Sequence, residues 1–389
     1  MSTRRTFLIA SAATAAAASQ ALPVGAAIPG LPSLALPITL GIAGPFTGAD
    51  RNLGLQLANG MQQAIYETNQ MHGSLDVMFA MRTIDDQNLL AQAVAAAHLA
   101  VDDSSIICIV GHLSGHGTEA ALRAYANAEM PVIIPASTYE KLTAYGYTSV
   151  LRLPTKDSTE GRLAAAYVVK EHKPARAGVI FQDGDYGLDV ANGFVNQLGA
   201  IPCQSVKCSW EKPNFAQAAH DALSENPDTI FLAGSVADMG KILGALRAAN
   251  YTGPLFASQG FFSAATIDTY AADAAGLIVS SSIPPVQLAP ANQSIIQDFR
   301  QNYGDFTPLS ALAYAGTQIA IAAIQRTGAR NRLDLWRALQ NPTTYDTVVG
   351  SFSFLATGDQ VDPNVYFYEV KDGKWSYLRS AYPTSFLAR

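Results

Sequence analysis

Residues 106–143 carry the feature that most constrains the fold, an apolar strand followed at once by a glycine-rich loop, a helix and a second strand. Residues 106–110 are apolar and rich in β-branched side chains, which is typical of a strand buried on both faces. Three glycines within residues 111–117 let the backbone turn sharply and approach a ligand closely. Residues 118–129 are the expected helix, and residues 131–135 the next strand. This order predicts an α/β fold with a parallel sheet.

The loops that follow these two strands are candidates for a binding site. In parallel sheets, small molecules bind beyond the carboxyl ends of the strands. Here those ends carry glycine amides, Ala136, the hydroxyls of Ser137 and Thr138, and the N-terminus of a helix. Together such groups hold a small anion or carboxylate. The stretch contains no apparent pair of nucleophile and base.

The alternation of strands and helices runs through most of the chain and restarts after residue 154, which indicates two α/β lobes with right-handed crossovers. Extended segments near residues 151, 280 and 349 are expected to cross between the lobes as a three-stranded hinge. The predicted N-terminal lobe comprises residues 36–152 and 283–348, and the C-terminal lobe residues 153–282 and 349–389. A hairpin with a polar Asp372-Gly373 turn is expected within residues 365–378.

The first 35 residues have the pattern of an export signal rather than of a folded segment. Arg4 and Arg5 precede an apolar, alanine-rich run, and small residues offer cleavage sites after Ala27 or Ala35. The paired arginines followed by Thr-Phe-Leu resemble the twin-arginine export motif. We therefore expect a periplasmic protein that is exported by a twin-arginine signal.

Composition limits the classes of partner and cofactor. The net charge is −6 and no basic block is present, so nucleic acid is not an expected partner. Cys108 falls in a predicted core strand and is expected to be a buried thiol. Cys203 and Cys208 lie close together, and export permits a disulfide between them, a question that the sequence leaves open. No metal-ligand spacing is convincing, and we expect neither a metal nor a cofactor.

The mature chain, over roughly residues 37–380, resembles the periplasmic branched-chain amino-acid-binding proteins, which are the type I solute receptors of ABC importers. The likeness rests on the order and spacing of many short motifs. These motifs are Gly44-Pro-Phe-Thr-Gly48, Asp85-Asp86, Val110-Gly-His-Leu113, Pro135-Ala-Ser-Thr138, Lys141-Leu-Thr143, Leu151-Arg152, Asp157, Asp185-Tyr186-Gly187, Leu188 and Tyr314-Ala-Gly-Thr-Gln318. The resemblance implies a Venus-flytrap fold, in which two Rossmann-like lobes close on a solute. It also implies a small-molecule solute and an inner-membrane ABC permease as partners, and we expect a monomer.

Carried over position by position, the resemblance implies specific contacts. It places a solute carboxylate near Gly115, Thr118 and the Thr138 hydroxyl, and an ammonium group near the Ala136 carbonyl and Thr138. The apolar part of the solute would contact a separate set of side chains, and two loops would close over it. The apolar set is Leu53, Leu113, Tyr186 and Tyr314, and the closing loops are those at Ser235 and Gln259.

Three departures from the family pattern bear on the solute. The family's amino-acid binders usually have serine at the position of Gly115, an acidic residue that pairs the ammonium at the position of Gln259, and often aromatic residues where Leu53 and Ser235 stand. A buried ammonium without its carboxylate costs several kcal/mol. A solute without an ammonium group, such as an aromatic or aliphatic carboxylate or an amide, therefore fits Gln259 better. Asp183, Asp185 or Asp238 remain alternative partners for an ammonium group.

Several side chains have both a structural and a functional interpretation. His112 is expected to be an oriented structural side chain, and His116 a candidate contact in the cleft. A hydrolase would have to use catalytic residues from among Ser114, Ser137, His112, His116 and Asp85. The sequence contains no Gly-x-Ser-x-Gly nucleophile elbow and no phosphate-loop signature. We therefore expect a protein that is not an enzyme. A sensory or regulatory flytrap module is the main alternative to a transport receptor.

Overall fold

The computed structural model describes residues 36–71, 77–209, 211–289 and 292–381. The chain divides into two units, residues 1–36 and residues 37–389, and every described helix and strand belongs to the second. The predicted export signal lies outside the described residues, so the structure leaves that prediction untested.

The first lobe is built on a five-stranded parallel sheet with the order β2-β1-β3-β4-β5. Helices cover both of its faces, so the central strands β3 and β4 are apolar throughout, whereas the edge strand β2 carries exposed Arg82 and Thr83. One layer contains α1, α11 and α12, and the other contains α2 and α3. The strands are β1 (Ile38–Gly44), β2 (Phe79–Asp85), β3 (Ile106–Val110), β4 (Val132–Ile134) and β5 (Val150–Arg152), and the helices are α1 (Arg51–Met71), α2 (Leu90–Asp102), α3 (Gly115–Asn127), α11 (Pro308–Thr327) and α12 (Arg332–Gln340).

The second lobe is built on a seven-stranded sheet with the order β14-β13-β10-β9-β8-β6-β7. Its first five strands along the chain are parallel, and β13 and β14 add an antiparallel hairpin. Helices α4 and α5 pack on one face, and α6 and α8 on the other. The elements are α4 (Asp157–His172), β6 (Ala177–Gln182), α5 (Asp185–Leu198), β7 (Cys203–Cys208), α6 (Phe215–Leu223), β8 (Thr229–Ala233), α7 (Val236–Met239), α8 (Lys241–Ala248), β9 (Leu255–Ala257), β10 (Ile278–Ser281), β13 (Tyr366–Lys371) and β14 (Lys374–Ser380).

Strand β8 shows how two helix layers produce a largely apolar strand. Ile230 and Leu232 pack in the core cluster that contains α6 and α8. Phe231 and Ala233 point to the opposite face and pack with α4 and α5. Because side chains alternate across a strand, a central strand of a sheet covered on both faces favours apolar residues at consecutive positions, as at residues 230–233. The predicted α/β fold with two lobes is confirmed.

Short elements complete the chain between and after the sheets. Among the described strands, β11 and β12 pair only with each other, and Val349 and Phe352 pack in the core of the first lobe. The third crossing between the sheets therefore runs from β12 to β13, through residues 353–365, later than the expected position near 349. The predicted boundaries of the two lobes stay a prediction. The short elements are η1 (Glu140–Thr143), η2 (Gln259–Phe261), α9 (Ala264–Tyr270), η3 (Val286–Leu288), α10 (Gln293–Tyr303), β11 (Tyr345–Thr347) and β12 (Gly350–Phe352).

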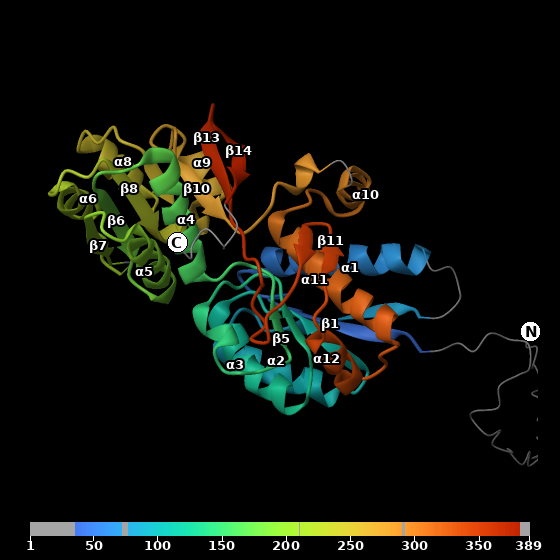
Figure 1. Cartoon of the computed structure of the whole chain (residues 1–389). Helices are drawn as coiled ribbons and strands as arrows, with labels where there is room; N and C mark the ends of the chain where they lie inside the picture. Colours follow the sequence, from blue (N-terminus) through green and yellow to red (C-terminus); the bar gives the residue numbers. More distant parts are fainter. Residues whose placement is uncertain (1–35, 72–76, 210, 290–291, 382–389) are drawn as a thin grey trace, which may run out of the picture. The chain divides into compact units, whose positions relative to one another are not determined.

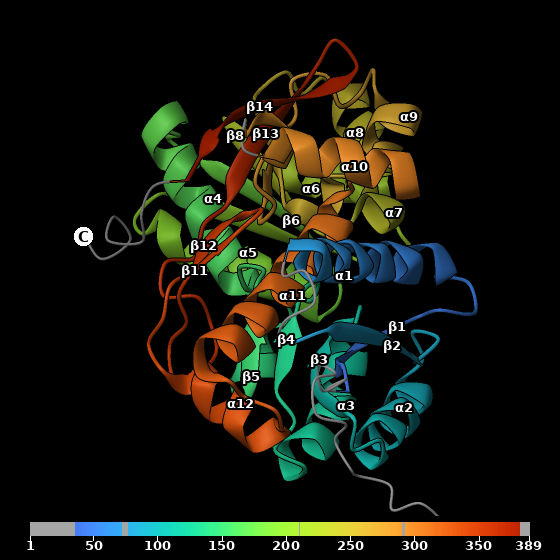
Figure 2. The same cartoon turned by 90° about the vertical axis from the view of Figure 1, so that its right-hand side faces the viewer.

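Close helix contacts rely on glycine at three sites. Helices α1 and α11 lie side by side in both views (Figure 1, Figure 2), and a Cβ at Gly60 would lie 2.2 Å from the Ser310 carbonyl oxygen. Helices α4 and α5 make the same kind of contact in both directions. A Cβ at Gly161 would lie 2.0 Å from the Val190 oxygen, and one at Gly193 would lie 2.1 Å from the Ser158 oxygen.

Arg152, at the end of β5, is a fully buried cation whose donors are all used. Its Nε donates to Asp359 Oδ1 at 2.9 Å, and its Nη2 donates to the same oxygen and to Thr143 Oγ1. Its Nη1 donates to the carbonyls of Thr138 at 3.1 Å and Tyr139 at 2.5 Å. The guanidinium thus joins the end of β5 to the third crossing and to the loop that follows β4.

Glu160, in the first turn of α4, is a buried carboxyl group that joins α4 to the neighbouring sheet. Its Oε1 accepts hydrogen bonds from the Ser280 hydroxyl and the Gln259 amide, both at 2.6 Å. Burial raises the pKa of Glu160 to about 7, although these hydrogen bonds oppose the rise.

The question of a disulfide between Cys203 and Cys208 is settled by their positions on β7. Both thiols are free, and the residues pair with opposite ends of β6, at Ala177 and Gln182. Five residues of strand separate their Cα atoms by about 16 Å. A disulfide needs Cα atoms within about 7 Å.

Neither a membrane span nor a metal cluster is found within the described residues. No single described helix is long and apolar enough to cross a membrane, and α10 and α11 pass that test only together, as a pair bent by 114°. No group of three His, Cys, Asp or Glu side chains in the described part of the chain could hold a metal ion.

Replacement of Gly161 or Gly193 by alanine is expected to lower the free energy of unfolding by about 1–3 kcal/mol, because the new methyl group meets the backbone of the facing helix. Alanine is otherwise the better helix former by about 1 kcal/mol. Gly244→Ala is the matched control, since its Cβ would approach only the Asp273 side chain, at 3.0 Å. Urea unfolding measures the difference, and equal stability of G161A and G244A would contradict the close contact.

Glu160→Gln is expected to raise the free energy of unfolding relative to wild type by more at pH 8 than at pH 5. The folded-state pKa of Glu160 lies above its ordinary value of 4.5, so the folded state holds a proton that the unfolded state releases. Wild-type stability from this group is therefore present below pH 4.5 and is lost as the pH rises through 7. The gain of E160Q over wild type should increase by on the order of 1–3 kcal/mol between pH 5 and pH 8. A constant difference across that range, in urea melts, would show that Glu160 ionises normally.

Candidate functional site

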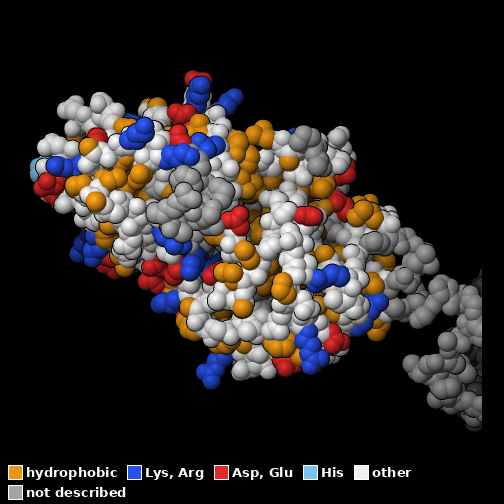
Figure 3. All heavy atoms as spheres, viewed as in Figure 1, with side chains coloured by type: hydrophobic (Ala, Val, Ile, Leu, Met, Phe, Trp, Pro, Cys, Tyr) orange, Lys and Arg blue, Asp and Glu red, His pale blue; other side chains and the backbone are white. Residues whose placement is uncertain are grey.

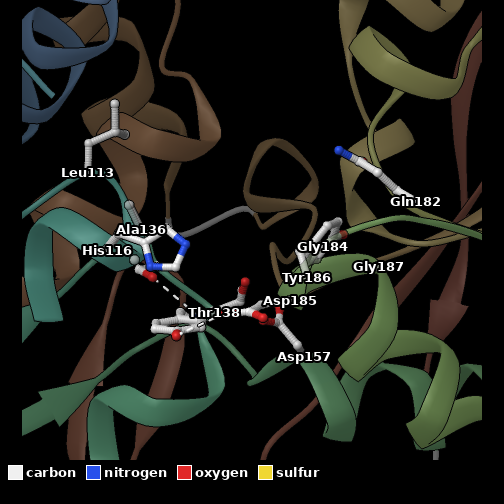
Figure 4. A pocket seen from close by; sticks show the side chains of 13 residues that line it. Leu113, His116, Ala136, Thr138, Asp157, Gln182, Gly184, Asp185, Tyr186 and Gly187 are labelled. Carbon is white, nitrogen blue, oxygen red and sulfur yellow. Dashed lines mark hydrogen bonds between the residues drawn. The ribbon is translucent and has the colours of Figure 1, made fainter. Parts of the chain in front are cut away.

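A pocket of about 390 Å³ lies beyond the carboxyl ends of β3 and β4 in one sheet and of β6 in the other. Figure 4 shows Leu113, His116 and Ala136 on one side and Gln182, Tyr186 and Gly187 on the other. The pocket therefore lies where the parallel-sheet rule places ligands, with both lobes contributing. The lining residues are Leu113, Gly115, His116, Ala136, Ser137, Thr138, Tyr139, Asp157, Gln182, Gly184, Asp185, Tyr186 and Gly187.

The N-terminus of α3 forms part of the first wall. The helix begins at Gly115, earlier than the expected start at Thr118, and the hydroxyl of Ser114 accepts a hydrogen bond from the Gly117 amide at 3.2 Å. The first amides of a helix have no partner within it, so those of Gly115 and His116 are oriented toward the pocket end of α3. Amides in this position attract a negatively charged group.

The loop after β4 supplies the rest of this wall and is held in place from behind. Ser137 Oγ accepts a hydrogen bond from the Tyr139 amide at 3.3 Å. Arg152 binds the Thr138 and Tyr139 carbonyls, so the backbone of this loop is fixed while the Thr138 side chain stays beside the pocket. The Thr138 side chain hydrogen-bonds to the Asp157 carboxyl group, so the first amides of α3 are the groups of this wall best suited to bind a carboxylate.

A side chain at position 115 would clash with the side chain of Tyr139. A Cβ at Gly115 would lie 2.5 Å from the Tyr139 Cβ, and the Tyr139 hydroxyl donates to Asp185 Oδ2 at 3.1 Å. The serine that the resembled family usually has at this position cannot fit beside Tyr139 without a shift. The departure at Gly115 therefore has a local packing cause.

The opposite wall is formed by the N-terminal turn of α5 and the end of β6. Tyr186 donates to Ser258 Oγ at 3.1 Å and accepts from the Gly260 amide at 3.0 Å. Burial raises its pKa well above the usual value, so the phenol stays neutral. The Gln182 side chain donates to Asp238 at 2.7 Å and accepts from the Ser235 amide at 3.0 Å.

Two carboxyl groups, Asp157 and Asp185, line the pocket, whereas none of the described lining residues is Lys or Arg. Asp157 is 1% exposed, and its Oδ1 has no hydrogen-bond partner among the described residues. Burial raises the pKa of Asp157 to about 8. A hydrogen bond from Thr138 opposes that rise, the carboxylates of Glu160 and Glu140 add to it, and Arg152 lowers it again.

Seven of the residues predicted as ligand contacts line this pocket. They are Leu113, Gly115, His116, Ala136, Ser137, Thr138 and Tyr186. Their contacts with a ligand stay a prediction, but the structure brings them together around one space.

The other five predicted contacts lie outside the pocket lining. Thr118 is fully buried and its hydroxyl donates to the Ser114 carbonyl at 2.6 Å, and Tyr314 lies in the core with its hydroxyl on Glu67. Leu53 is an exposed residue of α1. Their proposed contacts were carried over from a family resemblance, which does not fix how each side chain points in this chain.

Ser235 and Gln259 make other contacts in this structure. Ser235 caps α7, and its hydroxyl donates to Asp238 at 2.7 Å. Gln259 Oε1 accepts from the amide and the hydroxyl of Ser282, at 2.7 and 2.5 Å. The side chain of Gln259 is thus bound to the second crossing between the lobes rather than aimed at the pocket.

Sequence reasoning missed Tyr139 and Gln182 and gave Asp157 no role in binding. The sequence does offer a signal for each. Tyr139 directly follows Thr138, and Gln182 is the last residue of a strand. Asp157 is the first residue of a helix that begins right after the first crossing. Residues at these positions meet at the same edge of the sheets.

His112 has the structural role that was expected of it. Its side chain is fully buried, with Nδ1 2.5 Å from Asp86 Oδ2 and Nε2 3.0 Å from the Tyr125 hydroxyl. His112 is not among the residues that line the pocket, and its contact gives Asp86 a structural role.

Comparison with known proteins agrees with this geometry. The family model described as periplasmic binding protein matches residues 37–374. The Leu/Ile/Val-binding protein of Citrobacter freundii is 28% identical over 83% of this chain and 88% of its own length. A substrate-binding protein of an ABC transporter from Desulfitobacterium hafniense, solved in complex with Leu, is 25% identical with a TM-score of 0.75, covering 88% of this chain and 99% of its own.

A more distant structure has the same fold. A solute-binding protein of an ABC transporter from R. palustris, solved in complex with benzoate, is 18% identical with a TM-score of 0.73, covering 89% of this chain and 97% of its own. The family model spans almost all of the described chain, from β1 to the start of β14. The chain belongs to the periplasmic binding protein family.

Proposed function

We propose that this protein is the exported solute receptor of an ABC importer. It captures a small carboxylate-, amide- or amino-acid-like metabolite between its lobes and delivers it unchanged to a membrane permease. It acts in the periplasm as a monomer, after export by the twin-arginine-like signal at residues 4–8, and it performs no catalysis.

The observation that carries this proposal is the shared pocket. Thr138 and the first amides of α3 come from one sheet, and Tyr186 and Gln182 come from the other. A ligand that contacts both walls favours the closed state, in which the lobes are together. A transport receptor presents this ligand-bound closed state to its permease.

The relatives support a solute with a carboxylate. The D. hafniense protein is complexed with Leu and the R. palustris protein with benzoate, and both ligands carry a carboxylate group. In this chain the N-terminus of α3 and the hydroxyl of Thr138 are suited to that group. The surface agrees with a small-molecule role, because Figure 3 shows acidic and basic side chains interspersed on the face in view rather than one basic patch.

A thermal-shift screen tests the proposal. One compound among amino acids, aromatic acids, dicarboxylates and amides should raise the melting temperature, because a ligand that binds only the folded state stabilises it by mass action. At a hundred times its dissociation constant the ligand adds about 2.7 kcal/mol. Recovery of the ligand unchanged after incubation supports a receptor. Turnover of the ligand, or no shift with any of these classes, would contradict the proposal.

Thr138→Ala is expected to weaken binding of the compound found in that screen by about 1–3 kcal/mol, because it removes a hydroxyl from the pocket wall. Thr252→Ala, at an exposed position in the loop before β9, is the matched control and should leave affinity unchanged. Isothermal titration measures both variants. Wild-type affinity in T138A would place the carboxylate site elsewhere.

A further inference from the structure

We propose that Tyr139 is a positioning residue, whose hydrogen bond to Asp185 holds the two lobes together around the pocket before a solute binds. This inference deepens the proposed function and rests on it, because a bond that favours the closed state raises the affinity for any solute that needs both walls. Tyr139 acts through Asp185 and need not touch the solute.

The bond joins one wall of the pocket to the other. The Tyr139 hydroxyl donates to Asp185 Oδ2 at 3.1 Å, and both residues line the pocket. Tyr139 packs in a core cluster of the first lobe, whereas Asp185 is the first residue of α5 in the second lobe. Both partners belong to the chain, so the link across the pocket does not require a solute.

The first lobe fixes the position of the Tyr139 side chain. The Tyr139 amide donates to Ser137 Oγ at 3.3 Å, and its carbonyl accepts from the Arg152 guanidinium at 2.5 Å. Its ring contacts the His116 ring edge-on, with the centroids 4.9 Å apart. Because the backbone and the ring are both held, the bond from the hydroxyl to Asp185 constrains where α5 lies relative to the loop after β4.

The loop after β4 and η1 make other bonds to the second lobe, but these lie close to the first crossing. Thr138 binds Asp157 through its side chain and its carbonyl, and Glu140 accepts from the amide and the hydroxyl of Ser158 at 3.2 and 3.0 Å. Asp157 and Ser158 begin α4, directly after that crossing. Contacts near a pivot change little when lobes turn. Helix α5 follows β6 and is not part of a crossing, so of these contacts the bond across the pocket is the one that opening of the lobes breaks.

Like charges on the two lobes oppose the closed state beside this bond. Glu140 of η1 and Asp189 of α5 belong to opposite lobes, and burial, followed by the negative charges of Glu140 and Asp185, raises the pKa of Asp189. Glu119 of α3 adds negative charge on the side of the first lobe, and Lys141 of η1 offsets part of the repulsion. The hydrogen bond across the pocket acts against this repulsion, so its loss shifts the balance toward the open state.

A hydrogen bond between the walls changes affinity without changing the contacts of the solute. The observed dissociation constant equals the intrinsic one divided by the fraction of the protein in the binding-competent state. A hydrogen bond to a charged acceptor changes an equilibrium by about tenfold. Removal of the Tyr139 hydroxyl should therefore open the solute-free protein and raise the dissociation constant of a solute by about three- to tenfold.

Small-angle X-ray scattering tests the bond on protein that has been unfolded and refolded to remove any co-purified solute. Tyr139→Phe keeps the ring and removes only the hydroxyl, and it should increase the radius of gyration because the open state is more extended. Asp185→Ala should give the same increase, and the double variant should add nothing further, because both changes break one bond. Asp185→Asn keeps an acceptor oxygen and should scatter like wild type.

Tyr145→Phe is the matched control for this measurement. The Tyr145 hydroxyl also donates to a carboxylate, that of Glu119, but both residues belong to the first lobe. Y145F should therefore leave the radius of gyration unchanged. Wild-type scattering from both Y139F and D185A would overturn the proposal, and D185A keeps the test decisive if Y139F does not fold.

Titration with two named probes, L-leucine and benzoate, gives a second readout. For a probe that binds, Y139F should dissociate about three- to tenfold faster, because opening no longer breaks the bond, and Y145F should match wild type. Tighter binding by Y139F would show that the solute replaces the bond, which also overturns the proposal. The scattering needs no ligand and decides the assignment even if neither probe binds. Turnover, or no binding in the wider screen, would instead contradict the receptor proposal and leave the bond between the lobes standing.

Discussion

The buried guanidinium of Arg152 is the interaction on which the site depends. Arg152 is the last residue of β5, and its guanidinium donates hydrogen bonds to Asp359 on the third crossing and to the carbonyls of Thr138 and Tyr139. A buried cation is costly unless its donors are satisfied, and here they are. Since the same group fixes a crossing and a pocket wall, the loop after β4 is tied directly to the third crossing between the sheets.

The chemistry of the pocket follows from where the strands end. Strands β3, β4 and β6 each finish in a loop that leads to a helix or helical turn, and two of these, α3 and α5, begin at the pocket edge. Helix N-termini and hydroxyls favour negative charge, whereas Asp157 and Asp185 favour positive charge. A pocket with both kinds of group suits a molecule that is polar at two ends, and neither kind requires a metal or cofactor to explain its presence.

Local sequence patterns predicted the fold well because the forces that set it are local or periodic. The apolar run of β3 and the alternation of strands and helices identified the two sheets, and the Asp372-Gly373 turn marked the final hairpin. The site was harder to predict. Gln259 was predicted to close over the solute, but its side-chain oxygen accepts hydrogen bonds from Ser282 on the second crossing. That Asp157 Oδ1 is buried without a hydrogen-bond partner among the described residues depends on the residues around it in the folded chain, which sequence spacing does not reveal.

The steric conflict between Gly115 and Tyr139 has a consequence for how this pocket can diverge. A side chain at position 115 would collide with the tyrosine, whose hydroxyl in turn anchors to Asp185. The nearest atom is the Tyr139 Cβ, which every residue except glycine has, so loss of the aromatic ring alone would not make room. A lineage that gained a hydroxyl at the helix start would also have to shift the backbone of the loop after β4, so changes in ligand preference along this wall must pass through coupled steps.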